Sequence, residues 1–124
     1  MITNVAKQRM LKQLDVNNSD NGQGINAVIL LRRSDDGESE VQYTTDGQYG
    51  GIKTISWDST IVDTLEQDGN VTFDVEQGKR IVGYILIYDD GTTTTYNTVV
   101  LTNEYVFIED GTFTITNVKI TFGW

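Results

Sequence analysis

Short turn signals recur at regular intervals from residue 25 to the end of the chain. Each combines Gly with an acidic residue, with Gln or with a second Gly, and such residues favour tight turns. They occur at Asp35-Asp36-Gly37, Asp46-Gly47, Gly50-Gly51, Asp68-Gly69, Gln77-Gly78, Asp89-Asp90-Gly91 and Glu109-Asp110-Gly111. A spacing of roughly 8–12 residues between turns is typical of antiparallel sandwiches and barrels.

The segments between these turns are rich in β-branched and aromatic residues, which are favoured in strands. We predict strands at residues 25–33, 40–44, 52–58, 60–65, 70–75, 80–88, 93–101, 105–108 and 112–122. We expect them to form one mainly β domain over residues 25–124, an antiparallel β-sandwich with jelly-roll-like or Ig-like packing. The length of 124 residues fits a single domain of this kind.

Two of these strands carry most of the predicted core. Residues 80–88 are apolar on both faces, so we expect cover on both sides of the strand and a close approach or bulge at Gly83. In the last strand the apolar positions change parity between Ile115 and Val118. This change predicts a bend near Thr116-Asn117 that turns the chain between two packing environments. We also expect Trp57 to lie in the core.

Residues 1–15 are the only segment with helical periodicity. The apolar positions at this spacing are Ile2, Val5, Met10, Leu11 and Leu14. A loop rich in Asn and Gly separates the segment from the acidic body of the chain. The helix therefore either packs on its own sandwich or acts as an arm that docks on a partner. In the second interpretation the partner-binding residues are Ile2, Val5, Lys7, Arg9, Met10, Lys12 and the C-terminal Trp124.

The composition excludes several classes of function. The chain has no Cys and no His, which removes disulfides, thiolate or imidazole metal sites and the common nucleophile–imidazole pairs. Its 18 acidic against 9 basic residues give a net charge of −9, which opposes binding to nucleic acid or to an anionic membrane. The N-terminus has no signal-peptide pattern and no segment is long and apolar enough to span a membrane. We expect no cofactor and no catalysis.

Acidic turns and paired carboxylates raise two further possibilities. Calcium could be held by the acidic residues of three turns, at residues 35–38, 89–90 and 109–110, if these met at one end of a sandwich. The simpler explanation is that Asp-Gly makes hairpin turns and that surface carboxylates keep the protein soluble. Glycosidase chemistry needs two carboxyl groups roughly 5–10 Å apart, but no local motif singles out such a pair.

Exposed aromatic residues raise the possibility of glycan binding. Tyr43 and Tyr49 flank a turn and are expected to be exposed, and Trp124 ends the chain. In a glycan-binding β-sandwich module these residues would provide the ligand contacts.

The opening and closing segments of the chain resemble a type of small bacteriophage virion protein with an N-terminal helix and a β-domain. The first shared motif is Ile2-Thr3-Asn4-Val5-Ala6-Lys7 with Met10-Leu11. The second consists of Val71-Thr72-Phe73, Gly78, Ile81, Gly83 and Leu86. The third runs from Gly111-Thr112-Phe113-Thr114-Ile115 to Val118-Lys119-Ile120. Residues 16–70 carry no motif of this family.

The resemblance implies a structural virion component without chemistry, made in the host cytoplasm. We expect a capsid decoration or cement protein that contacts other virion proteins and forms a homo-oligomer. A tail or tail-fibre component is the alternative within the same biology, and a glycan-binding module is the alternative outside it.

Overall fold

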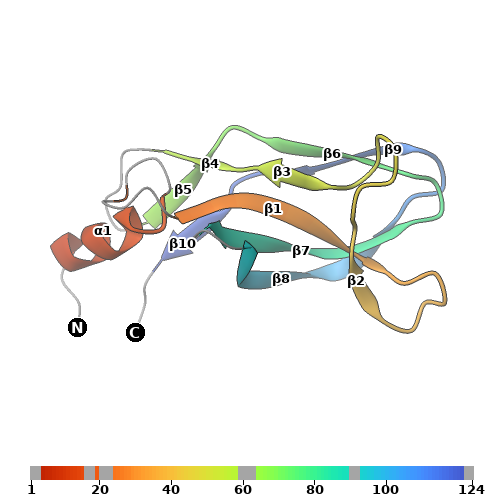
Figure 1. Cartoon of the computed structure of the whole chain (residues 1–124), viewed down its shortest axis with the longest axis horizontal. Helices are drawn as coiled ribbons and strands as arrows, with labels where there is room; N and C mark the ends of the chain where they lie inside the picture. The colour runs from red at the N-terminus through yellow and green to blue at the C-terminus, as the bar shows by residue number, and fades with distance from the viewer. Residues whose placement is uncertain (1–3, 16–18, 20–23, 59–63, 90–92, 122–124) are drawn as a thin grey trace.

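The computed structural model describes residues 4–15, 19, 24–58, 64–89 and 93–121. The protein is mainly β, with antiparallel sheets and one short N-terminal helix, as the sequence predicts (Figure 1). The elements of the described residues are α1 (Asn4–Lys12), β1 (Gly24–Arg33), β2 (Glu40–Gln42), β3 (Ile52–Thr54), β4 (Ser56–Trp57), β5 (Thr64–Asp68), β6 (Val71–Val75), β7 (Arg80–Asp89), β8 (Thr93–Val106), β9 (Gly111–Ile115) and β10 (Lys119–Thr121).

The largest sheet has the strand order β2-β1-β7-β8, and β3 also pairs with β1. The long strand β1 pairs with β3 along its first half and with β2 at its end, while β7 pairs with its other edge. Strand β8 is the outermost strand on the far side of β7. Residues 93–106 form one strand, so the prediction of two separate strands at 93–101 and 105–108 is wrong.

The remaining strands form two smaller antiparallel groups, β10-β5-β4 and β6-β9. Where one strand was expected at residues 52–58, the chain forms β3 and β4 with a break at Ile55, whose side chain is buried. The strand expected at residues 60–65 is found at Thr64–Asp68, and residues 60–63 lie outside the described part of the chain.

The predicted bend near Thr116-Asn117 is confirmed. β9 ends at Ile115 after pairing with β6, and β10 begins at Lys119 and pairs with β5. Asn117 lies between them with a φ of 58°, a left-handed conformation that Asn tolerates better than most residues. The last segment therefore leaves one packing environment and enters another.

The main core lies between the sheets and includes residues from most strands. Phe73, Leu65, Val28 and Leu86 are fully or almost fully buried there, as is Trp57 at 5% exposure. The Trp57 indole Nε1 donates to the carbonyl of Ile25 at 2.8 Å, which satisfies its one polar group. The prediction that Trp57 belongs to the core is confirmed.

A second apolar cluster lies on the other face of β1 and β7. It contains Ile29 and Leu31 from β1 and Val82, Ile85 and Ile87 from β7, all buried. Strand β7 is therefore buried on both faces, as its sequence predicts. A Cβ atom at Gly83 would collide with the backbone carbonyl of Val99, so this glycine permits the close approach of β7 and β8 that was expected.

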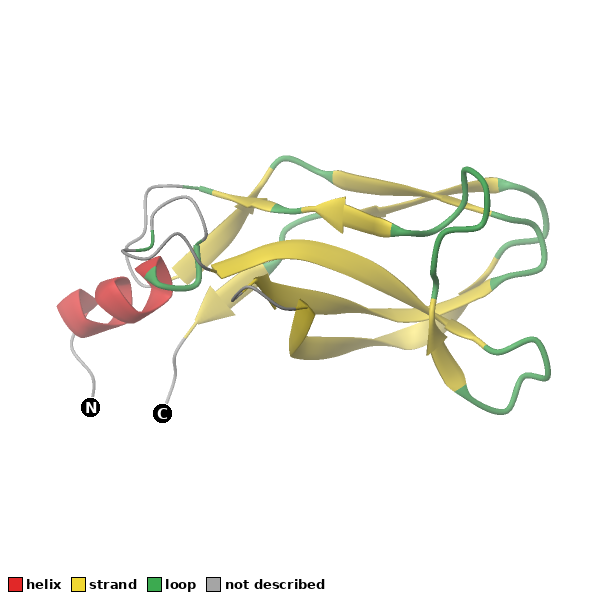
Figure 2. Cartoon of the chain, in the orientation of Figure 1, coloured by secondary structure: helices red, strands yellow, loops and turns green. Residues whose placement is uncertain are grey.

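Helix α1 packs against the end of the sandwich beside β5 and β10 (Figure 1). Leu11 is fully buried in the main core, and Asp15 after the helix forms a parallel bridge with Ile25 at the start of β1. The turns at residues 34–39, 43–51, 76–79 and 107–110 lie at the opposite end (Figure 2). We call this opposite end the loop end.

Candidate functional site

The turn between β8 and β9 presents an apolar side chain to solvent at the loop end. Ile108 is 83% exposed, the largest exposure among the large hydrophobic residues described. The residue before it is fixed, because the Phe107 amide donates to the carbonyl of Lys79 at 2.9 Å and the Gly78 amide donates to the carbonyl of Phe107 at 2.7 Å. Ile108 is therefore displayed by a hydrogen-bonded turn.

The far side of this turn is fixed by a carboxylate. Asp110 accepts a hydrogen bond from the Gln77 amide at 2.8 Å and another from the Tyr49 hydroxyl at 2.7 Å. These bonds hold the pKa of Asp110 below its usual value, with the Gln77 bond as the larger cause. In turn, the bond to Asp110 raises the pKa of Tyr49 to about 12. The turn is thus tied to the loops before β3 and before β7.

Aromatic rings line the strand that leads into the turn. The Tyr105 ring lies 4.9 Å from the ring of Phe107 and 6.2 Å from that of Phe113 in an edge-on arrangement. Tyr105 and the next residue, Val106, are 57% and 50% exposed. Residues 105–112 border a shallow cavity of about 340 Å³.

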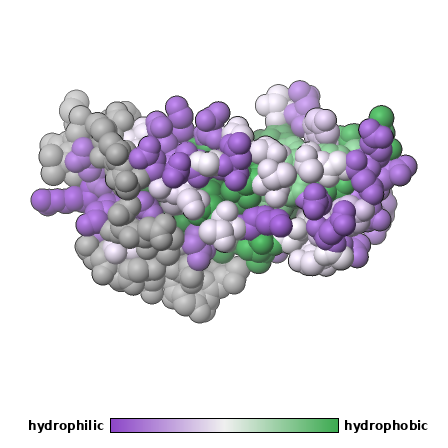
Figure 3. Space-filling view, turned by 90° about the horizontal axis from the view of Figure 1, so that it is seen from above, coloured by the Kyte–Doolittle hydropathy of each residue, from purple (hydrophilic) through white to green (hydrophobic). Residues whose placement is uncertain are grey.

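Exposed apolar side chains are concentrated in the segment that contains β8 and the turn after it, which we call the apolar flank. Of the seven large hydrophobic residues described as exposed, five lie between Tyr96 and Ile108. The five are Tyr96, Val100, Tyr105, Val106 and Ile108. On the face seen in Figure 3, apolar areas near the middle and toward one end lie between hydrophilic side chains. Tyr105, Val106 and Ile108 border one shallow cavity, and exposed apolar side chains that lie close together are typical of a protein–protein contact.

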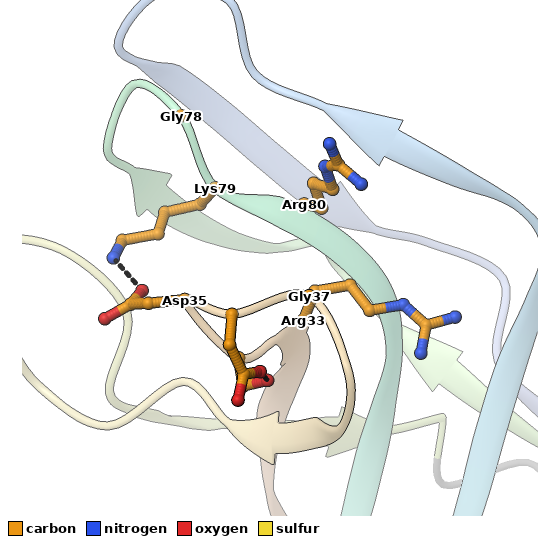
Figure 4. Close-up of a pocket in the computed structure, with 8 residues that line it drawn as sticks. Arg33, Asp35, Gly37, Gly78, Lys79 and Arg80 are labelled. Atoms are coloured by element: carbon orange, nitrogen blue, oxygen red, sulfur yellow. Dashed lines mark hydrogen bonds and ion pairs between the residues drawn. The ribbon is translucent and has the colours of Figure 1, made fainter.

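A second cavity at the loop end, of about 470 Å³, has a polar, charged lining (Figure 4). Lys79 points to Asp35 across 3.4 Å, and Arg32 pairs with the same carboxylate at 3.3 Å. Arg33 donates to Glu104 at 2.6 Å, and this bond raises the pKa of Arg33. Arg80 forms no ion pair with the described residues. Because two of the three cations that line the cavity, Lys79 and Arg33, already have a carboxylate partner, the cavity is poorly suited to an anionic ligand.

The expectation that Tyr43 is exposed is wrong. Its side chain is only 2% exposed, its ring packs on Gly50, and its hydroxyl accepts a hydrogen bond from the Glu76 amide at 3.1 Å. Tyr49 is half-buried and its hydroxyl is bound to Asp110. Tyr43 and Tyr49 therefore connect loops to one another, and the third predicted glycan contact, Trp124, lies outside the described part of the chain.

The predicted partner-binding residues of the N-terminal segment lie at the other end of the molecule. Arg9, Met10 and Lys12 are exposed on α1, while Leu11 between them is buried in the core. Ile2 and Trp124, and the side chains of Val5 and Lys7, lie outside the described part of the chain. The helix thus packs on its own domain through one face and leaves a cationic face in solvent.

The acidic turns considered for calcium do not meet. Asp35, Asp36 and Asp110 lie at the loop end, whereas Asp89 pairs with Gly24 at the start of β1, which is the opposite end of the strand. The described residues contain no group of three or more carboxylates placed to hold a metal ion.

The apolar flank was missed by sequence reasoning, although the sequence carries a signal for it. Residues 105–108 are four consecutive apolar residues, Tyr-Val-Phe-Ile. Since side chains alternate between the faces of a strand, one core cannot bury all four. The structure buries Phe107 and exposes the other three.

Comparisons with protein-family models, curated proteins and solved structures find no match to this chain. Across the described residues, no helix has the length and apolar character needed to cross a membrane. The function is therefore inferred from the surface of the molecule and from the motifs of its sequence.

Proposed function

We propose that this chain is a non-catalytic structural protein of a bacteriophage virion, which acts as a capsid decoration or cement protein through protein–protein contacts. The observation that carries the contact role is the concentration of exposed apolar side chains between Tyr96 and Ile108. Burying such side chains against a partner is favourable by about 25 cal/mol for each Å² of apolar surface removed from water.

The display of Ile108 supports an attachment role for the tip of this flank. Binding normally costs free energy because loops and side chains at the contact lose freedom. The turn that carries Ile108 is already fixed by bonds from Phe107, Gly78 and Asp110. Little further ordering of the backbone is needed when a partner covers it.

The chemistry of the chain supports the absence of catalysis. The sequence has neither His nor Cys, and most of the described cations at the loop end are paired with carboxylates. Assignment to a virion rests on the resemblance of the helix, of residues 71–86 and of residues 111–120 to small virion proteins. A net charge of −9 suits a protein present in many copies on particles that must stay apart.

Two other contacts remain predictions. The exposed face of α1, with Arg9, Met10 and Lys12, is a second attachment surface under the same proposal. Attachment to the tail or to a fibre would use the same surfaces at another place on the virion. No observation favours glycan binding, because Tyr43 is buried and the Tyr49 hydroxyl is occupied.

The test is co-sedimentation of the purified chain with particles of the phage that encodes it, with intact particles and tail-less heads assayed separately. Wild-type protein should sediment with heads. Ile108→Asp should weaken binding about tenfold, which corresponds to about 1.4 kcal/mol, the scale of a single important contact residue. Ile52→Asp is the matched control, since Ile52 is also exposed, at 57%, but lies on β3.

Failure of the wild-type protein to bind either particle would contradict the virion role. Binding to intact particles but not to heads would move the proposal from the capsid to the tail. Ile108→Asp binding as tightly as wild type would contradict attachment through the tip.

A further inference from the structure

The loop end, which displays Ile108, is strongly acidic. The four turns that form it contain seven acidic residues and one basic residue, Lys79 (Figure 2). Over the whole chain the numbers are 18 and 9. Negative charge is therefore concentrated at the end of the molecule that carries the most exposed apolar side chain.

The carboxylates closest to Ile108 along the chain and through hydrogen bonds are not neutralised. Glu109 and Asp110 follow it directly in the turn. Glu76 lies in the neighbouring loop, which is bonded to Asp110 through the amide of the next residue, Gln77. Within the described part of the chain, none of these three carboxylates forms an ion pair.

The cations near the turn do not cancel this charge. Lys79, in the same loop as Glu76, points to Asp35 at 3.4 Å (Figure 4). Arg80 is exposed and lies opposite Val106 on the ladder between β7 and β8. One exposed cation thus stands beside three carboxylates, so the surface around Ile108 keeps a negative charge.

An apolar projection inside an acidic rim selects the chemistry of its partner. Ile108 gains free energy only where its side chain leaves water, so the partner needs an apolar pocket. The rim of a contact stays close to solvent, where like charges repel, so the surface around that pocket needs to be basic. Nucleic acid and anionic lipid do not fit, because both are negatively charged.

A second copy of the chain is a poorer fit than a different protein. The exposed basic surface that another copy offers is that of α1, with Arg9 and Lys12. An exposed helix face is convex, whereas a projecting side chain such as Ile108 is buried best in a concave site.

We propose that the acidic loop end docks on a basic protein surface of the phage head, with Ile108 inserted in an apolar pocket that has Lys or Arg side chains around it. This rests on the proposed function and deepens it, because it states the chemistry of the partner. The fixed turn suits this role, since it holds Ile108 in place while the exposed Glu109 beside it faces the rim of the contact.

The first test is the salt dependence of co-sedimentation with tail-less heads. Raising the NaCl concentration from about 0.05 M to about 0.3 M shortens the screening length about 2.5-fold. The dissociation constant should rise at least about fivefold, because screening weakens the attraction between the acidic loop end and a basic rim.

The second test measures the sign of the partner's charge at the tip. Ile108→Asp and Ile108→Lys both remove the apolar contact, at a position that is 83% exposed and outside the core. Ile108→Lys should bind heads at least about threefold more weakly than Ile108→Asp, because a basic rim repels the new cation. Glu109→Lys should raise the dissociation constant at least about tenfold. Asp68→Lys makes the same charge reversal at an exposed position on β5, and it should leave binding within about twofold of wild type.

Each other outcome overturns the proposal in a distinct way. Binding that does not depend on salt, or Ile108→Lys binding more tightly than Ile108→Asp, would overturn the basic partner and leave the virion role standing. Wild type that does not bind heads would overturn this proposal together with the capsid role. If the purified chain self-associates in light scattering and Ile108→Asp makes it monomeric, a second copy covers the tip and the head does not.

Discussion

At the scale of single residues, the hydrogen bond between Tyr49 and Asp110 makes the stability of the protein depend on pH. The Tyr49 hydroxyl donates to the Asp110 carboxylate at 2.7 Å, and this bond is the main reason that the pKa of Tyr49 rises to about 12. An ordinary Tyr in an unfolded chain has a pKa near 10. The bond therefore stabilises the fold fully below about pH 10, and the stabilisation is lost as the pH rises towards 12.

We predict that Tyr49→Phe removes this alkaline step. Wild-type protein should lose more free energy of unfolding than the variant between about pH 10 and about pH 12, measured by urea denaturation. Tyr84, whose pKa is raised by burial, is present in both proteins, so its effect cancels in the difference. Parallel curves for the two proteins would show that the hydroxyl contributes nothing. On the acid side the variant should keep most of its dependence, because the Gln77 amide is the larger cause of the lowered pKa of Asp110.

At the scale of elements, α1 contacts the main core through Leu11 in its last turn. Leu11 is fully buried, whereas the preceding residue, Met10, is 41% exposed. Leu11→Ala should lower the free energy of unfolding by about 2–5 kcal/mol, and Met10→Ala should cost less than about 1 kcal/mol. Chemical denaturation of the two variants measures the difference. If both substitutions cost equally little, the helix does not share the cooperative unit of the sandwich.

The bend between β9 and β10 depends on one left-handed residue and one side chain from β5. Asn117 has a φ of 58°, and the Gln67 side chain bridges the bend, donating to the Ile115 carbonyl at 2.9 Å and accepting from the Val118 amide at 3.1 Å. Asn117→Val should destabilise by about 1–2 kcal/mol, because a β-branched residue is strained in this conformation. Asn117→Gly should be nearly neutral in the same denaturation assay. If Asn117→Val leaves the free energy of unfolding unchanged, the backbone at the bend adjusts to the new side chain without cost.

Some features of these elements could be predicted from the sequence, and others could not. Local periodicity in the sequence predicts the regular spacing of the strands, the burial of both faces of β7 and the bend at Thr116-Asn117. Local periodicity does not predict whether Tyr43 is exposed, because its burial depends on the packing of Gly50 against its ring. The exposed flank of β8 depends on which strand lies at the sheet edge, and strand order is a long-range property that short segments do not encode.

At the scale of the whole molecule, charge is distributed along the long axis. The exposed basic side chains of Arg9 and Lys12 lie on α1, and exposed acidic side chains, among them Asp35, Asp36 and Glu109, lie in the turns of the loop end. Helix α1 and the loop end are at opposite ends of the molecule (Figure 1). The two ends of the molecule therefore carry unlike exposed charges. Two copies of the chain repel each other through their net charge of −9, whereas α1 of one copy and the loop end of another would attract each other through unlike charges.

Salt acts on this repulsion and on this attraction in opposite directions, so the effect of salt on self-association shows which of them is larger. Raising the NaCl concentration from about 0.02 M to about 0.3 M shortens the screening length from more than 20 Å to less than 10 Å. This weakens the repulsion between copies of net charge −9, so the apparent mass of the protein in solution should not fall when salt is added. Sedimentation equilibrium at both salt concentrations measures it. An apparent mass that falls with salt would instead indicate head-to-tail contact through Arg9 and Lys12, and the substitution Lys12→Glu should then abolish it.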